Sequence, residues 1–189
     1  MHTTPEIELA LSLVKDYGFR DPKSLAKALK IKILTYSDVS ERTGKKIKLR
    51  GYASIQAGRK YIHIRENLSP YMEMMVIAHE IGHLLLHGDI LRKGSPLLDS
   101  KLFGLRDRVE YEANVFAAFL LLDKDDVMKK LTGGYTQAQT AASCNVDVKM
   151  LNLFLKELIK RKEIPAMDID TPEVGFLGTI NDDYEEDWT

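Results

Sequence analysis

The chain has 189 residues, of which 44% are hydrophobic and 29% are charged, a balance typical of a globular domain. This length suffices for one sizeable core, and a single cysteine excludes an internal disulfide. No apolar run approaches the roughly 20 residues that span a membrane, and the N-terminus lacks the basic and apolar regions of a signal peptide. We therefore expect a cytoplasmic protein.

The net charge of −1 hides an uneven distribution along the chain. All 27 Lys and Arg residues lie before residue 163, whereas nine of the 28 Asp and Glu residues lie after residue 162, so residues 1–162 carry a net charge of +8. An acidic C-terminal segment usually forms a solvated tail. Because this tail also holds Phe176 and Trp188, a second hypothesis is that it docks on the basic body and covers a cleft.

The first predicted elements are two short helices. Apolar residues recur at helical spacing over residues 6–17, and Gly18 marks the end of that helix. Asp21 and Pro22 favour the start of a second helix, which runs to Leu29. Aspartate caps helix N-termini, and proline suits the first helical position.

A small sheet is predicted next. Residues 31–36 read as a strand, and residues 51–56 and 60–65 read as two more, joined in a hairpin across residues 57–59. Between them, residues 41–50 form a basic segment that we expect to be a solvated loop. We further expect the strand 60–65 to form an edge of this sheet, where an extended peptide can pair with its backbone.

The sequence His79-Glu80-Ile81-Gly82-His83 has the pattern H-E-x-x-H, within an apolar segment of helical length that contains no proline. Residues four apart lie on one face of a helix, so both imidazoles can reach one metal ion. Neutral imidazole is a common zinc ligand, and Glu80 is then placed to take a proton from a water molecule that the metal polarises. The motif therefore predicts a metallopeptidase site.

A catalytic zinc site has three protein ligands and one open position, so a third ligand must lie elsewhere. His87 is two helical turns from His79, about 12 Å along the axis, which is too far to share an ion. We expect His87 to pack or form hydrogen bonds near the helix end. Asp89 is a weaker candidate. Ligation by Asp89 would need a turn made by a glycine at position 86, but that residue is Leu86, and the glycine comes two residues later, at Gly88.

Stronger candidates lie in the segment EYEANVFAAFLLL, within a helix predicted over residues 106–122. Glu110 shares a face with Asn114, which can orient it. Glu112 shares a face with apolar residues, so its carboxylate needs a partner such as a metal. Either glutamate can also serve only to complement the helix dipole. These residues alone leave the choice between Glu110 and Glu112 open.

The C-terminal part predicts three more helices, over residues 123–131, 136–143 and 146–161. The last two have a helix-turn-helix rhythm with a turn at Asn145. The second of them is rich in Leu and Phe and poor in groups that read bases or phosphates. We therefore expect a protein contact here and no nucleic-acid binding.

The segments HEIGHLLLH and EYEANVFAAFLLL resemble the motifs of the ImmA/IrrE metallopeptidases, and the small sheet over residues 31–65 fits the family layout. The resemblance implies an α+β, zincin-like fold: a small antiparallel sheet packed on the H-E-x-x-H helix, followed by a mainly helical C-terminal region. In the family, the ligand glutamate lies 27 residues after the second motif histidine and four before the asparagine. Both counts select Glu110, with Glu112 as the fallback. The chain departs from the pattern at Leu122-Asp123, where the family has Met-Pro.

The resemblance also implies a function. His79, His83 and Glu110 would hold zinc, or manganese, and Glu80 would act as the base of an endopeptidase. The substrate would be a regulatory protein such as a helix-turn-helix repressor, in a phage, mobile-element or stress-response setting. The alternative is a non-catalytic or toxin-like partner of a repressor that keeps the fold. We expect a metallopeptidase domain over residues 1–131, a helical region over 132–162 and the acidic tail over 163–189.

Overall fold

The computed structural model describes residues 4–37, 50–92 and 103–169, with the backbone alone for residues 103–107. Most of the predicted basic loop, residues 41–49, lies outside the described residues. So do residues 170–189 of the acidic tail, and the hypothesis of a docked tail therefore concerns a segment beyond this description. None of the described helices is long and apolar enough to cross a membrane.

The N-terminal helices follow their sequence signals. Helix α1 (Pro5–Tyr17) ends at Gly18, whose φ of 72° is the left-handed conformation that glycine adopts without strain. Helix α2 (Pro22–Ala28) begins after Asp21, whose carboxylate accepts a hydrogen bond of 2.8 Å from the Ser24 backbone N–H. Both helix predictions are confirmed.

A three-stranded sheet follows, made of β1 (Lys32–Tyr36), β2 (Gly51–Gln56) and β3 (Arg59–Arg65). Strands β2 and β3 form the predicted antiparallel hairpin. Ala57 and Gly58 make its turn with φ values of 47° and 74°, the positive pair that a two-residue hairpin turn requires. On β3, Ile62 and Ile64 are buried on one face of the sheet, whereas the alternate residues Tyr61, His63 and Arg65 are partly exposed.

The strand order differs from the expected antiparallel sheet and from the expectation that residues 60–65 form its edge. The order is β1-β3-β2, and β1 runs parallel to β3, so the sheet is mixed and not antiparallel throughout. A hairpin turn forces β2 and β3 to be antiparallel, but the long connection after β1 lets that strand reach the far side of β3. The prediction that residues 60–65 form an edge is therefore wrong, because β3 is the central strand.

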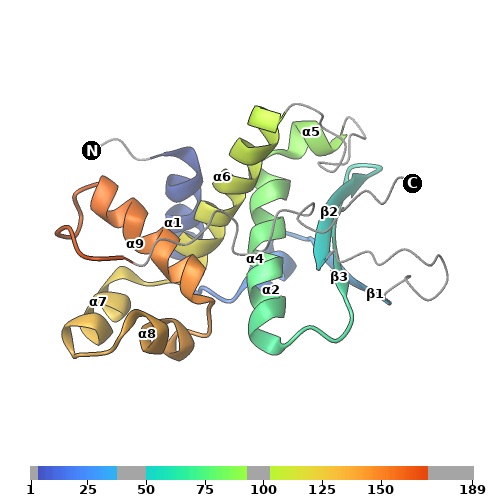
Figure 1. The fold of residues 1–189 in the computed structure, drawn as a ribbon. Helices are drawn as coiled ribbons and strands as arrows, with labels where there is room; N and C mark the ends of the chain where they lie inside the picture. The colour runs from blue at the N-terminus through green and yellow to red at the C-terminus, as the bar shows by residue number, and fades with distance from the viewer. Residues whose placement is uncertain (1–3, 38–49, 93–102, 170–189) are drawn as a thin grey trace, which may run out of the picture.

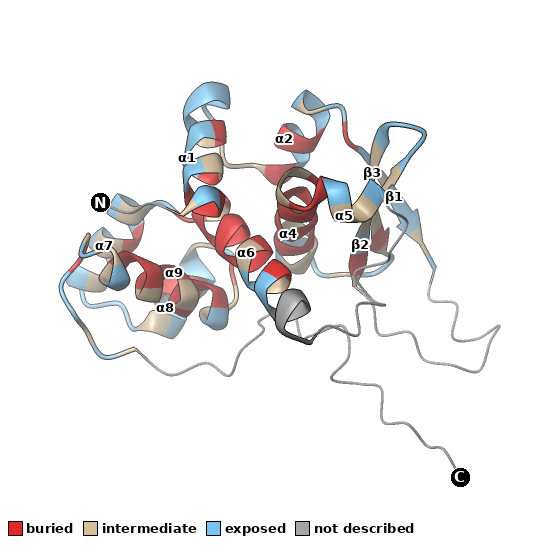
Figure 2. Cartoon of the chain, turned by 90° about the horizontal axis from the view of Figure 1, so that it is seen from above, coloured by how far each residue is buried: buried red, intermediate tan, exposed pale blue. Residues whose placement is uncertain are grey.

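Helix α4 (Pro70–Leu86) carries the H-E-x-x-H motif and lies between the sheet and helix α6 (Phe103–Leu121) (Figure 1). All residues from Met75 to Leu84 are buried, as expected of a helix that is covered on all sides (Figure 2). Gly82 faces α6 closely: a Cβ on it would lie 3.0 Å from Phe116 Cδ1 and 3.3 Å from Ala113 Cα. The missing side chain therefore lets the two helices approach.

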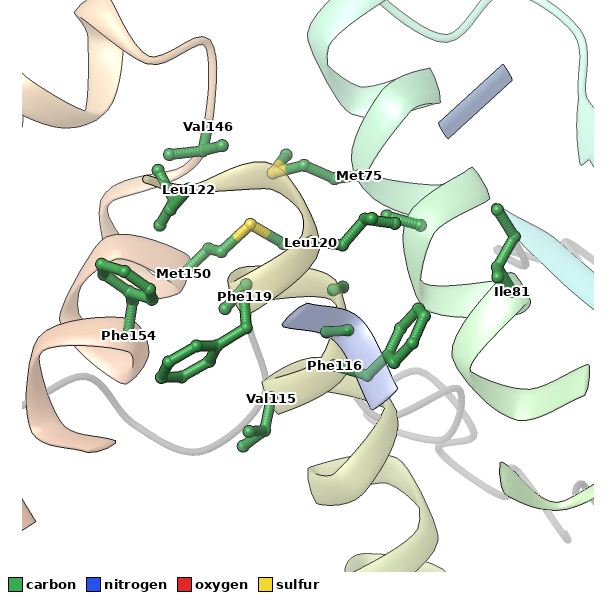
Figure 3. Packing of buried hydrophobic residues seen from close by; sticks show 14 of the residues in the cluster. Met75, Ile81, Val115, Phe116, Phe119, Leu120, Leu122, Val146, Met150 and Phe154 are labelled. Atoms are coloured by element: carbon green, nitrogen blue, oxygen red, sulfur yellow. The ribbon is translucent and has the colours of Figure 1, made fainter. Parts of the chain in front are cut away.

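The remaining helices are α5 (Gly88–Arg92), α7 (Lys124–Thr132), α8 (Gln137–Ser143) and α9 (Val148–Lys160). A capping box between Thr136 and Gln139 starts α8, and Asn145, with a φ of 55°, forms the turn before α9. Helix α9 packs its apolar face on α6, where the rings of Phe119 and Phe154 lie 4.7 Å apart (Figure 3). Its Leu and Phe residues thus belong to the core.

Candidate metal centre

Two histidines of α4 point at the same spot. His79 and His83 are one helical turn apart, and their Nε2 atoms are 2.9 Å from each other. Both are almost fully buried, with 3% and 2% of their surfaces exposed. Two imidazoles held in this way can offer nitrogen lone pairs to a single divalent ion.

A carboxylate from α6 completes the cluster. Glu110 Oε2 lies 3.3 Å from His79 Nε2, and Glu110 Oε1 lies 3.4 Å from His83 Nε2. Ligand atoms of the three residues all lie within 4.8 Å of one another. In a tetrahedral zinc site with bonds of 2.0–2.1 Å, ligand atoms are about 3.3 Å apart, so this donor set fits zinc.

The surroundings of His79 also fit a bound cation. Its Nδ1 and the Oδ1 of Asn114 are both buried, and neither has a hydrogen-bond partner among the described residues, although the Asn114 side chain interacts with the imidazole. A histidine that binds a metal through Nε2 carries its proton on Nδ1, and Asn114 Oδ1 can accept it. The sequence paired Asn114 with Glu110 on one helix face, but the structure places it beside His79.

The electrostatics of the cluster favour a positive charge at its centre. Burial opposes ionisation of Glu110, but hydrogen bonds from both imidazoles hold the pKa of its carboxyl well below the ordinary value. Burial also acts to lower the pKa of His79, yet the Glu110 carboxylate outweighs it and raises that pKa overall. Burial and repulsion from His79 lower the pKa of His83 to about 4. The negative charge of Glu110 that raises the pKa of His79 is the same charge that a cation bound at the cluster would compensate.

Glu80 lies against β2 and is close enough to His79 and Glu110 to interact electrostatically with both. Its carboxylate accepts a hydrogen bond from the backbone N–H of Ala53. Gly51 lets β2 lie close to α4, since a Cβ there would lie 2.5 Å from Val76 Cγ1. Burial raises the pKa of Glu80 to about 7, which suits a base that must gain and lose a proton near neutral pH. Sequence reasoning missed the contact between Ala53 and Glu80, and the one signal for it was the glycine at the start of β2.

The model of the IrrE N-terminal-like domain family matches residues 26–156, well over half of the chain. The chain belongs to the ImmA/IrrE metallopeptidase family. The match extends from α2 to α9, so it includes the sheet, both helices that carry the cluster, and most of the C-terminal helical region.

Two known proteins are similar to this chain over part of its length. Immunity region protein 2 of Bacillus phage phi105 is 31% identical over 110 residues, which cover 58% of this chain and 63% of that protein. The metallopeptidase ImmA of Bacillus subtilis is 38% identical over 87 residues, which cover 45% of this chain and 48% of that protein. The similarity thus spans less than two thirds of either relative.

The structure brings Glu110, the residue favoured by the ImmA/IrrE spacing, into the cluster, and it leaves the other candidates outside. Glu112 Oε2 lies 3.0 Å from His87 Nε2, and its Oε1 accepts a hydrogen bond of 2.6 Å from Arg108 Nε. His87 therefore forms hydrogen bonds near the helix end, as expected. Asp89 forms an ion pair with Arg92 on α5.

The burial of Glu80 predicts a stability effect in the metal-free protein. Its folded pKa of about 7 lies above its ordinary value of 4.5, so the folded state binds more protons between these values and stability falls as the pH rises through them. Glu80→Gln should therefore be more stable than the unsubstituted chain above about pH 7, by up to about 3 kcal/mol. Urea unfolding of chelator-treated protein measures this difference, which should vanish in acid. A difference that does not change with pH would contradict the assignment.

The cluster also predicts unequal effects of two neighbouring substitutions on metal affinity. Glu110→Gln removes an anionic oxygen from the cluster and should weaken zinc binding by more than about 100-fold, whereas Glu112→Gln should weaken it by less than about tenfold. Competition with a fluorescent chelator measures both constants. Equal losses, or a larger loss for Glu112→Gln, would reverse the assignment of the third ligand.

Proposed function

We propose that this protein is a zinc-dependent endopeptidase, with manganese as the alternative metal. The observation that carries the proposal is the placement of a buried carboxylate, Glu80, next to His79 on α4, where it interacts electrostatically with His79 and with Glu110 of α6. His79, His83 and Glu110 would hold the ion, which supplies Lewis-acid polarisation when bound. Glu80 takes a proton from the attacking water and delivers it to the leaving amine.

We infer that the substrate is a regulatory protein, such as a helix-turn-helix repressor, in the cytoplasm of a cell that carries phage or mobile-element genes. The name of the Bacillus phage phi105 relative places that protein in an immunity region, and the name of the Bacillus subtilis relative makes it a metallopeptidase. These names support a role in immunity regulation for this chain. Nucleic acid is not the proposed partner, because the apolar residues of α9 are buried against α6.

The alternative is a regulatory protein that keeps the fold and the metal without turnover. A purely structural zinc site needs its ligands but gains nothing from a buried carboxylate that the ion does not require. Keeping Glu80 ionised in this position costs stability, as its raised pKa implies. That cost supports the enzyme over the non-catalytic partner.

We propose that the substrate backbone pairs with the outer edge of β2. The Arg65 N–H donates to Arg50 O, so the pair Arg50 and Arg65 is hydrogen-bonded across the two strands. In an antiparallel ladder such pairs alternate with pairs that are not hydrogen-bonded. The backbone N–H and C=O groups of Gly51, Ala53 and Ile55 therefore point away from β3. The bond from Ala53 N–H to Glu80 agrees with that direction. An extended peptide on this edge would pass beside Glu80. Because the contacts are to the peptide backbone, they would place little restriction on the substrate's amino-acid sequence.

The proposed function predicts that some substitutions remove both the metal and the cleavage activity, whereas another removes the activity alone. The purified protein should contain about one divalent ion per chain, lost in His79→Ala and His83→Ala but retained in Glu80→Gln. His63→Ala, which changes a histidine of β3, is the control that should keep the metal. Cleavage is measured by mass spectrometry on a proteome-derived peptide library. Cleavage that persists in Glu80→Gln would rule out the mechanism, and a metal-free protein would rule out the site.

The proposed substrate edge predicts a specific effect of proline in β2. Ile55→Pro removes an outward N–H without breaking the ladder to β3, and Ile55→Ala removes the same side chain but keeps that N–H. Loss of one backbone hydrogen bond to the substrate, about 1 kcal/mol, should lower kcat/KM of the proline variant roughly fivefold relative to the alanine variant. Metal content should be equal in both. Equal kcat/KM values would show that substrate does not pair with β2.

A further inference from the structure

A continuous chain of side-chain contacts leads from the metal cluster toward the surface. His83 Nδ1 lies 3.1 Å from His87 Nδ1. The other ring nitrogen of His87, Nε2, lies 3.0 Å from Glu112 Oε2, and Arg108 Nε donates to the second Glu112 oxygen at 2.6 Å. Each side chain in this series thus contacts the previous one through one polar atom and the next one through another.

A metal ion bound at His83 Nε2 would allow a single arrangement of protons. Nε2 faces His79 and Glu110, and to bind a metal it must offer its lone pair, so the proton of His83 must then sit on Nδ1. His83 Nδ1–H then donates to His87 Nδ1. His87 consequently carries its proton on Nε2 and donates it to Glu112, an acceptor that Arg108 also holds in place.

The position of His87 makes this arrangement rigid. The imidazole is buried, with 6% of the residue exposed. Its backbone N–H donates to His83 O at 2.9 Å at the end of α4, and its carbonyl accepts from Ile90 N at 3.0 Å at the start of α5. The ring is thus fixed at the junction of two helices. Arg108 is 77% exposed, so its link to Glu112 contributes least.

We propose that His87 is a positioning residue that commits His83 to bind the metal through Nε2, with Glu112 as the acceptor that fixes the proton of His87. This inference rests on the proposed metal site but goes beyond it, because neither residue touches the ion. It also gives Glu112 a function that is distinct from ligation: both of its carboxylate oxygens are engaged away from the cluster.

A matched pair of substitutions tests the role of His87. Leucine and asparagine have the same number of side-chain heavy atoms and the same branching, but asparagine alone can place an oxygen near the position of Nδ1 and accept the His83 N–H. His87→Leu should weaken zinc binding about 10- to 100-fold, whereas His87→Asn should stay within about threefold of the unsubstituted chain. If His87 served only to fill the core, the polar asparagine would be the more harmful of the two. Affinities within threefold for both variants, or equal losses, would overturn the proposal.

A second readout reports the geometry at the ion directly. The visible absorption spectrum of the Co²⁺-loaded protein should change in His87→Leu and be restored in His87→Asn, because the spectrum depends on how His83 is oriented. Glu112→Ala, at a partly exposed position that tolerates truncation, should shift zinc affinity in the same direction as His87→Leu but by less. No effect of Glu112→Ala on affinity would remove Glu112 from the proposal.

Controls separate this inference from the proposed function. His63→Leu removes another histidine with a side-chain hydrogen bond, 3.1 Å to Ser54 Oγ, and should leave zinc affinity unchanged. Unfolding of each metal-free variant shows that the fold is kept. An unsubstituted chain that binds no divalent ion refutes the proposed function itself. Tight binding that is indifferent to His87→Leu refutes only the positioning role.

Discussion

The close approach of α4 and α6 at Gly82 is the contact on which the candidate metal centre depends. Phe116 and Ala113 lie where a side chain at Gly82 would be, so the two helix backbones sit nearer than bulkier residues allow. The same approach brings Glu110 of α6 within 3.3–3.4 Å of two imidazoles on α4. Since interiors are close-packed, a wider spacing could not be absorbed locally and would separate the three groups.

The rest of the molecule holds α6 in this position. At its C-terminal end, the guanidinium of Arg20 donates to the carbonyls of Phe119 and Leu122 at 2.8 and 2.7 Å, which satisfies groups that a helix end leaves unpaired. Phe154 of α9 contacts the same stretch (Figure 3), and α1 packs against α6 (Figure 1). The C-terminal helices therefore act as a scaffold for the helix that supplies Glu110.

The site concentrates charge where the protein is least able to solvate it. Glu80, His79 and His83 are almost fully buried, and Glu110 is ionised only because two imidazoles face it. Groups held in this way cost stability in the absence of a cation and become compensated when one binds. The large apolar core around α4 and α6 offsets that cost, as is common where a functional site conflicts with stability.

Local features of this protein were determined by the sequence itself. The spacing of His79 and His83, the caps at Gly18 and Asp21, and the tight turn at Ala57-Gly58 depend on neighbours a few residues away, and all appear as expected. Three features depend on long-range packing: β3 is the central strand, Asn114 lies beside His79, and Glu112 forms a hydrogen bond with His87. Helical and strand periods fix which residues share a face, but the neighbour of each face is chosen by long-range packing, which no local pattern encodes.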